Sequence, residues 1–227
     1  MIWNWQQPDW PNFTYNSAKL ADFEKHLLLN AGILFGAYKH LDDADQQYIT
    51  VELISNEALK TSAIEGEVLD RDSLQSSICR QFGLKTDQRK VSAAEQGIAE
   101  VMVDLYQNFA APLSHNILHT WHTMLTNGRR NLNDIGRYRT QNEPMQIVSG
   151  AIYNPKIHFA APPAAQVSAE MQRFINWFND SAPDGTSPLP TIIRAAIAHL
   201  YFVSIHPYED GNGRIGRAIA EKPWLNV

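Results

Sequence analysis

Apolar residues recur at helical spacing along almost the whole chain, and this feature restricts the fold more than any other. From Ser17 onward they return every three to four residues, in runs too long for strands. Residues that cap helices precede several runs, and glycine or proline follows most of them. The pattern predicts an all-α fold. The expected helices cover residues 16–40, 44–64, 70–83, 91–109, 114–125, 166–178, 191–205 and 213–223.

One stretch, residues 145–159, has the character of β-strand. Gln146-Ile147-Val148 and Ile152-Tyr153 flank Ser149-Gly150, which predicts a short hairpin that turns at Ser149 and Gly150. The first sixteen residues differ again, with five aromatic side chains among prolines that forbid a continuous helix. We expect an extended arm whose aromatic side chains pack on the body. A peptide-binding or membrane-touching arm has less support, because no basic residue accompanies the aromatic ones.

Composition limits the classes of function. The formal net charge of -5 argues against non-specific nucleic-acid binding, which depends on clustered Lys and Arg. The single cysteine, Cys79, excludes an intramolecular disulfide framework, and we expect a packed, reduced thiol. Neither a signal peptide nor a transmembrane segment is evident, so a cytoplasmic location without membrane contact is expected.

Residues 206–217 combine several features of a phosphate-binding loop. The sequence is His-Pro-Tyr-Glu-Asp-Gly-Asn-Gly-Arg-Ile-Gly-Arg, directly after the most apolar helix. The glycines allow a tight turn, and the free N–H groups of the helix that follows point toward one place. Arg214 and Arg217 lie on one helical face and supply donors for phosphate oxygens. Asp210 suits magnesium, and His206 can take a proton from a hydroxyl near neutral pH.

This segment resembles the Fic-domain signature, His-x-Phe-x-Asp/Glu-Gly-Asn-Gly-Arg-x-x-Arg, with Tyr208 in place of the usual Phe. The resemblance implies a helical fold with a small hairpin, and transfer of AMP from ATP to a Ser, Thr or Tyr hydroxyl of a protein. His206 would be the base, Asp210 would hold Mg²⁺, and Arg217 would bind the γ-phosphate. The nucleotide-binding residues implied are Gly211, Asn212, Gly213, Arg214, Gly216 and Arg217.

A second segment, Thr61-Ser-Ala-Ile-Glu65-Gly66, resembles the family's inhibitory motif, Ser/Thr-x-x-x-Glu-Gly/Asn. In the class whose inhibitory helix precedes the core, the glutamate pairs with the second signature arginine. Here that pair would be Glu65 and Arg217, and it would exclude the γ-phosphate. Taken alone, Glu65 is equally consistent with a solvated charge near a helix end.

The resemblance also assigns the hairpin and the domains. The hairpin fits the family's flap, whose edge pairs with the target segment through Gln146, Ile147 and Val148; otherwise it is an ordinary cover for the core. Before it, Gly136-Arg-Tyr-Arg139 resembles the family's approach to the flap, where Arg137 or Arg139 either positions nucleotide or is a surface charge. We expect an N-terminal helical extension over residues 1–85, similar to that of a bacterial subfamily, and a catalytic core over 86–227.

Some alternatives remain. Only ten residues follow Arg217, so we expect a truncated C-terminus and a central helix covered by a partner chain or by a second copy of this chain. His115, His119 and His122 share one helix, and we expect surface side chains rather than a zinc site. Removal of AMP is the reverse reaction, with Glu65 orienting a water. A nucleotide-binding regulator without catalysis is the alternative from another class.

Overall fold

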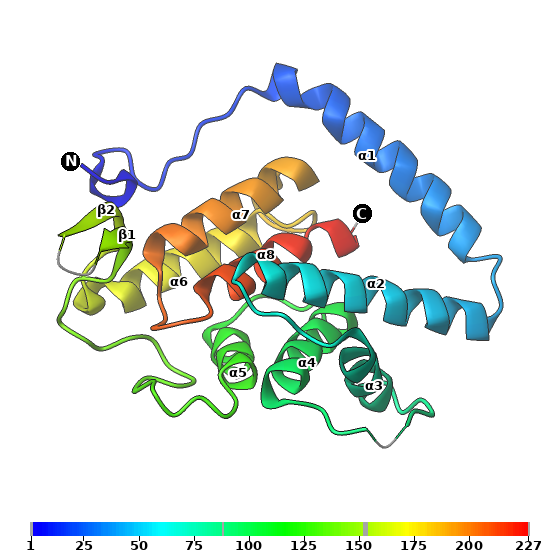
Figure 1. Ribbon diagram of the computed structural model, residues 1–227. Helices are drawn as coiled ribbons and strands as arrows, with labels where there is room; N and C mark the ends of the chain where they lie inside the picture. The colour runs from blue at the N-terminus through cyan, green and yellow to red at the C-terminus, as the bar shows by residue number, and fades with distance from the viewer. Residues whose placement is uncertain (1, 88, 152–153, 227) are drawn as a thin grey trace.

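The computed structural model describes residues 2–87, 89–151 and 154–226. The described chain is mostly helical with one two-stranded antiparallel sheet (Figure 1), so the predicted fold class is confirmed. In chain order the elements are η1 (Asn4–Gln6), α1 (Ser17–Tyr38), α2 (Asp43–Ile64), α3 (Arg71–Gln81), α4 (Ala93–Gln107), α5 (His115–Leu125), β1 (Gln146–Ala151), β2 (Asn154–Ala160), α6 (Ala164–Asp180), α7 (Thr191–Ile205), α8 (Asn212–Glu221) and η2 (Trp224–Asn226).

Local side-chain chemistry explains where the helices begin and end. The side chains of Asn16, Asp70 and Ser114 each accept a hydrogen bond from the backbone N–H three residues ahead, as N-caps do. Gly66 and Gly83 follow α2 and α3 with φ of 78° and 69°, a conformation that costs glycine little. The sequence-based boundaries are therefore close to the observed ones.

Helix α7 lies at the centre of the fold. It packs against α6 on one side and α8 on the other, and α8 also contacts α2 and α5. Burying α7 places its C-terminal end, and the loop that follows it, on a rigid core. The largest fully buried side chains are Trp121, Tyr201, Tyr208, Phe174, Phe178 and Phe202.

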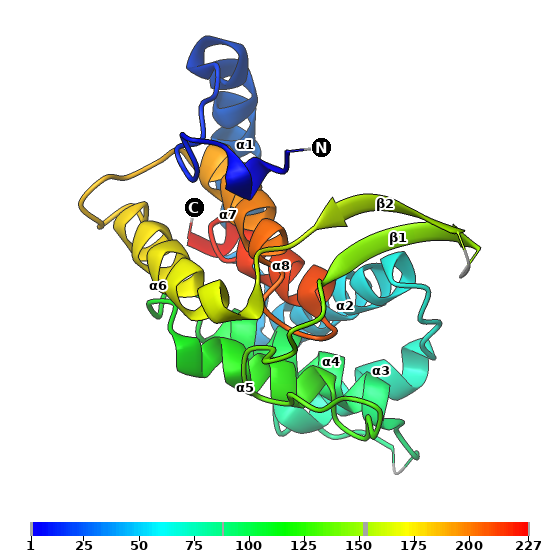
Figure 2. The same ribbon diagram turned by 90° about the vertical axis from the view of Figure 1, so that its left-hand side faces the viewer.

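The hairpin projects from the helices, as Figure 2 shows. Its register pairs Gln146 with Ala160, and Ser149 with Lys156, with an irregularity between Ile147 and Val148. The predicted turn at Ser149 and Gly150 is wrong, because both residues belong to β1. Glycine weakens a strand but does not end it when its partner strand continues. The predicted second strand at 152–153 lies outside the described residues.

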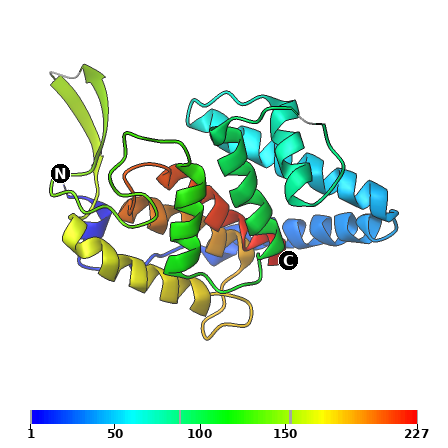
Figure 3. The same cartoon turned by 90° about the horizontal axis from the view of Figure 1, so that it is seen from below.

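The N-terminal arm packs on the body, while α1 stands apart from it. The Trp10 ring meets Tyr201 edge to face with ring centroids 5.0 Å apart, in agreement with the expected arm. Figure 3 shows α1 and the turn that joins it to α2 at the end of the molecule opposite to the hairpin. Helix α1 has no buried residue. Glu24 joins it to α7 by accepting hydrogen bonds from the Thr191 and Ile192 N–H groups at 2.7 and 3.1 Å. Cys79 is half-buried beside the core, and burial raises the pKa of its thiol.

Candidate functional site

The loop between α7 and α8 is held by its own side chains. Asn212 receives a hydrogen bond from the Tyr208 N–H at 2.9 Å and donates one to the Tyr208 carbonyl at 2.8 Å. Gly211 has a φ of 78° and precedes α8 directly. The first N–H groups of α8 have no partner within the helix and so point into the space above the loop. The Asn212 side chain thus stabilises the loop through the Tyr208 backbone and does not face the space above the loop.

His206 stands at the edge of this loop in an unusual conformation. Its φ of 51° makes it the one non-glycine residue with positive φ among those described. Its Nδ1 lies 3.3 Å from the Val203 carbonyl, which can only accept a hydrogen bond. Nδ1 therefore carries the proton, and the lone pair of Nε2 is free to accept one.

The environment of His206 favours its neutral form. Burial lowers the pKa of His206, and the positive charge of Arg139 lowers it further. The Val203 carbonyl, Glu65 and Asp210 act in the opposite direction, more weakly than burial. At neutral pH the ring is thus a base ready to accept a proton.

Arg217 and Glu65 lie together, as the sequence suggested. Nη2 of Arg217 is 2.5 Å from Oε1 of Glu65. The same guanidinium donates from Nε to the Thr61 hydroxyl at 2.7 Å and from Nη2 to the Thr61 carbonyl at 3.0 Å. The first and fifth residues of the Thr61–Gly66 motif therefore bind Arg217 jointly. Gly66 has the positive φ that ends α2 directly after Glu65.

The Glu65 carboxylate also closes the N-terminus of α8. A Cβ atom added to Gly213 would lie 2.1 Å from Oε1 of Glu65. Only glycine leaves room at this position for the carboxylate. The N-terminus of a helix is where an anion is stabilised by free N–H groups and the helix dipole. Glu65 thus occupies a site built for an anion.

A second glutamate, Glu67, holds the other arginine of α8. Oε2 of Glu67 is 2.7 Å from Nη1 of Arg214, whose side chain is 5% exposed. Nε of Arg214 is buried without a hydrogen-bond partner among the described residues. Sequence reasoning missed Glu67, although its spacing of two residues from Glu65, across a glycine, was a usable signal.

Asp210 is the one carboxylate of the loop that fits the predicted magnesium role. Its Oδ1 accepts a hydrogen bond from the Gly211 N–H at 2.6 Å, and its Oδ2 lies 2.8 Å from Nη2 of Arg129. The side chain is 35% exposed, and magnesium in nucleotide sites needs only one or two carboxylates besides phosphate oxygens. The donor set fits provided that Arg129 gives way. Arg129 is a further residue that sequence reasoning did not single out.

Gly216 lies apart from the cradle that the loop and the N-terminus of α8 form. A Cβ there would meet Val203 at 3.0 Å and both His199 and Phe202 at 3.3 Å. Gly216 therefore lets α7 and α8 approach each other closely. Gly216 faces α7 rather than the cradle, so its role here is in helix packing and not in the predicted contact with nucleotide.

The histidines of α5 are not surface residues, and that expectation is wrong. His122 is fully buried and stacks on Tyr208 with ring centroids 4.1 Å apart. Burial lowers the pKa of His122 to about 4. His115 and His119 are half-buried, and their Nδ1 atoms lie 2.6 and 3.1 Å from the hydroxyls of Tyr138 and Tyr208. Helical spacing places the three on related faces, but it does not tell which face the loop will cover.

The two arginines before the hairpin differ sharply. Arg137 is 63% exposed and pairs with Asp134. Arg139 is 3% exposed, so the interpretation as a surface charge is wrong for it. Its Nε donates to the His206 carbonyl at 2.8 Å.

The three flap residues lie on β1 as expected. Ile147 and Val148 expose 46% and 49% of their surface, so this strand offers apolar side chains to the outside. In Figure 2, β1 lies on the side of the hairpin that faces α2 and β2 on the other.

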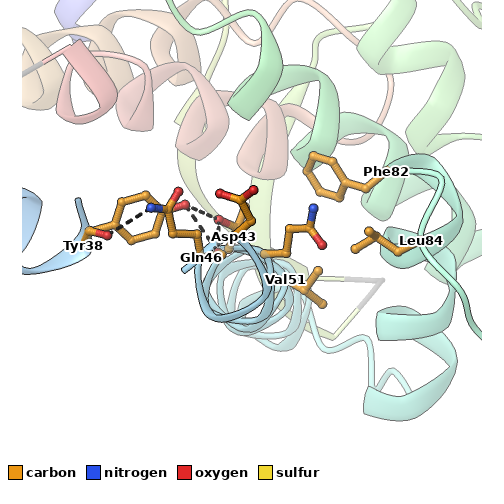
Figure 4. Close-up of a pocket in the computed structure, with 8 residues that line it drawn as sticks. Tyr38, Asp43, Gln46, Val51, Phe82 and Leu84 are labelled. Atoms are coloured by element: carbon orange, nitrogen blue, oxygen red, sulfur yellow. Dashed lines mark hydrogen bonds between the residues drawn. The ribbon is translucent and has the colours of Figure 1, made fainter. Parts of the chain in front are cut away.

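Two pockets of the protein differ in the charged residues that line them. One of about 290 Å³ lies where α1 and α2 meet the end of α3 (Figure 4). It has no arginine or lysine in its lining, and Tyr38 there donates to or accepts from Thr50 at 3.0 Å. A larger pocket, about 620 Å³, lies between α2 and α8 and includes Thr61, Arg214 and Arg217. Only the second has the cations that phosphate needs.

The fold and the site define an α-helical protein with an anion cradle after its central helix, closed by carboxylates of its own chain. Residues 112–223 match the family model described as the Fic/DOC family. Residues 3–84 match a model described as a domain of unknown function, DUF4172. The chain therefore carries a Fic/DOC family domain.

Relatives of known name are similar over short segments. The protein adenylyltransferase fic-1 of Caenorhabditis briggsae is 35% identical over 77 residues, which are 34% of this chain and 14% of that protein. The protein adenylyltransferase Fic of Drosophila virilis is 40% identical over 58 residues, which are 26% of this chain and 11% of that protein. The matched segments thus span a small part of these relatives.

Solved structures share the fold. A Fic family protein from Desulfovibrio desulfuricans G20 superposes with a TM-score of 0.60 at 22% identity, over 94% of this chain and 59% of that one. A Fic-domain signaling protein from Bacteroides thetaiotaomicron gives a TM-score of 0.63 at 18% identity, over 88% and 71%. Within the described residues, no helix has the length and apolar character needed to cross a membrane.

Proposed function

We propose that this chain is an autoinhibited protein adenylyltransferase, which transfers AMP from ATP to a Ser, Thr or Tyr hydroxyl of a protein. The observation that carries the proposal is the Glu65 carboxylate on the N-terminus of α8 and on Arg217. A carboxylate of the chain itself in this cradle supports a site that binds an anionic ligand, such as a nucleotide phosphate, once the carboxylate has moved away. The relatives named protein adenylyltransferase supply the class of reaction.

In the proposed reaction, the acceptor hydroxyl oxygen attacks the α-phosphorus of ATP. The bond from that phosphorus to the bridging oxygen breaks, and pyrophosphate leaves. His206 takes the hydroxyl proton on Nε2, because Nδ1 is already protonated toward Val203. Asp210 would hold Mg²⁺, which neutralises phosphate charge when bound.

The N–H groups of Gly213 and Arg214 at the start of α8 would receive the phosphates together with both arginines. With Glu65 on Arg217, the γ-phosphate finds its charge partner occupied, so ATP cannot bind in the reactive pose. An extended segment of the target would pair with the edge of β1 beside Gln146, Ile147 and Val148 and present its hydroxyl.

The test is self-labelling with ATP labelled at the α-phosphate. We expect Glu65→Gly to raise labelling at least about tenfold, since a hydrogen bond to a charged group contributes about 1.5–3 kcal/mol. His206→Ala added to that variant should abolish labelling, and Asp22→Asn on the exposed helix α1 serves as a matched loss of one carboxylate.

Calorimetry with ATP and Mg²⁺ separates transfer from the alternatives. ATP binding by Glu65→Gly without labelling would leave a nucleotide-binding regulator. Release of AMP from a pre-labelled protein by the parent chain, lost in Glu65→Gly, would instead indicate removal of AMP. Unchanged labelling when His206→Ala is added to Glu65→Gly would remove His206 from the role of base.

A further inference from the structure

Arg139 is a buried cation that joins three segments of the chain near His206. Its guanidinium donates from Nε to the His206 carbonyl at 2.8 Å and from Nη2 to the Pro162 carbonyl at 2.5 Å. A longer contact of 3.5 Å joins Nη2 to the Ile205 carbonyl. No ion pair of Arg139 is found among the described residues, so backbone carbonyl groups stabilise its charge.

The carbonyls that Arg139 binds belong to two different functional parts. Ile205 and His206 are the end of α7, where unpaired carbonyls and the helix dipole concentrate negative charge. Pro162 lies two residues after the end of β2, and the neighbouring Ala161 N–H donates to the Met145 carbonyl at 2.9 Å, which closes the base of the hairpin. One side chain therefore bridges the helix that carries His206 and the base of the flap.

The backbone of His206 depends on this bridge. A non-glycine residue keeps a positive φ only where its surroundings hold it. The His206 N–H donates to Phe202 at 3.1 Å, Arg139 holds the His206 carbonyl, and the Arg139 N–H donates to the Pro207 carbonyl at 2.9 Å. The peptide groups on both sides of the His206 Cα are thus fixed, and two of these three bonds come from Arg139.

We propose that Arg139 is a positioning residue that holds the His206 ring and the base of the flap in one fixed relation. The inference rests on the proposed function, since it assigns the base and the target strand a common anchor. Lysine keeps the charge but has no fork-shaped set of donors, so it cannot reach both carbonyl groups at once. Methionine has a similar reach and removes the charge as well.

The parent fold offers a matched control in Arg194. Arg194 is also buried, at 4% exposed, and it also binds a carbonyl, that of Phe178 at 3.0 Å. It lies near the N-terminal end of α7, at the opposite end from His206. Arg194→Lys therefore disturbs a buried arginine on the same core without touching the flap or His206.

The first experiment needs no activity. Hydrogen exchange of residues 146–160 and the proton resonance titration of the His206 ring are compared in the parent, Arg139→Lys, Arg139→Met and Arg194→Lys. We expect the flap to exchange faster than in the parent in both Arg139 variants. In Arg194→Lys we expect its exchange rate to equal that of the parent.

The same titration separates charge from geometry. The charged groups that face His206 are Arg139, Glu65 and Asp210, and the cation lowers its pKa while the carboxylates raise it. Loss of the cation in Arg139→Met should move the His206 titration upward by about half a pH unit or more, and Arg139→Lys should move it less. In the unmodified protein, the Arg139 Nε–H should give a resolved, slowly exchanging signal, a test that does not depend on any variant folding.

The second experiment measures self-labelling against pH in the Glu65→Gly background. Arg139→Lys should lower the maximal rate by about tenfold or more while leaving ATP affinity within about twofold, because His206 is displaced and the cradle is not. Arg139→Met should also move the acidic limb of the profile to higher pH.

The outcomes are separable. If Glu65→Gly does not label at all, the proposed function fails while the exchange and titration results still decide the role of Arg139. Unchanged flap exchange and His206 titration in both Arg139 variants, equal effects from Arg194→Lys, or a freely exchanging Arg139 Nε–H would each overturn the inference.

Discussion

Two glutamates separated by one glycine each hold a different arginine of α8. Glu65 pairs with Arg217 at 2.5 Å, and Glu67 pairs with Arg214 at 2.7 Å. Arg214 is the more deeply buried of the two, and its charge has few other partners, since Asp210 lies 4.0 Å away. In the resting site, each of the two arginine charges is therefore neutralised by its own glutamate.

The Glu67 contact predicts that replacing Glu65 alone leaves part of the restraint in place. Glu67→Gln in the Glu65→Gly background should tighten ATP binding a further fivefold or so, because a contact with a charged group contributes about 1 kcal/mol or more. Calorimetric titration with ATP measures this. Asp22→Asn in the same background controls for net charge, and an equal gain in that variant would remove the specific role of Glu67.

Whether the role and burial of a single residue can be predicted from the sequence depends on where its contact partners lie in the chain. His206, Arg217 and Glu65 were found because each belongs to a short pattern of characteristic spacing. The burial of His122 and Arg139 was missed, because Tyr208 and the His206 carbonyl, which contact them, come from a loop far along the chain. Sequence spacing gives the face of a helix but not what covers it.

At the scale of elements, boundaries were predictable wherever a cap or a glycine sets them locally. The hairpin turn was misplaced because Ser149-Gly150 has the composition of a turn, while the register is set across the sheet by Lys156 and Pro155. Gly216 was given to the nucleotide for a similar reason. Its neighbour across the helix packing, Val203, is what requires a glycine there.

Helix α8 ends in an acidic side chain that should couple its stability to pH. Glu221 accepts a hydrogen bond from the Tyr106 hydroxyl at 2.7 Å, and burial, with a smaller effect of Glu57, raises the pKa of Glu221 to about 7. The ordinary value is 4.5, so the folded state binds the proton more tightly than the unfolded state does. Stability from this group is full below pH 4.5 and is lost as pH rises to about 7.

Glu221→Gln should remove that loss. We expect the variant to be more stable than the parent by about 1–3 kcal/mol at pH 8 and nearly equal to it at pH 4.5, as urea unfolding at the two pH values would measure. Glu100→Gln on α4 is the control for a glutamate change elsewhere. A constant difference between Glu221→Gln and the parent across this range would contradict the assigned cause.

At the scale of the whole molecule, the N-terminal arm reaches the same corner as the flap and the end of α7. The Trp5 indole N–H donates to the Ala160 carbonyl at 2.6 Å, and the Asn4 amide donates to the Ser204 hydroxyl at 2.5 Å. The Trp3 ring meets Phe159 edge to face, with centroids 5.6 Å apart. The segment matched by the DUF4172 model thus contacts the segment matched by the Fic/DOC model both at β2 and near the C-terminal end of α7.

This arrangement predicts that the arm steadies the flap. Trp5→Phe keeps an aromatic ring but removes the indole donor, so the Ala160 carbonyl loses its partner at a cost of about 1 kcal/mol. Hydrogen exchange at residues 154–160 should become severalfold faster, while exchange in α4, on the far side of the core, should not change. Trp224→Phe makes the same change of side chain near the C-terminus, away from the hairpin. If Trp5→Phe and Trp224→Phe give the same exchange rates in the hairpin, the arm does not steady the hairpin, and the contacts of the arm serve packing alone.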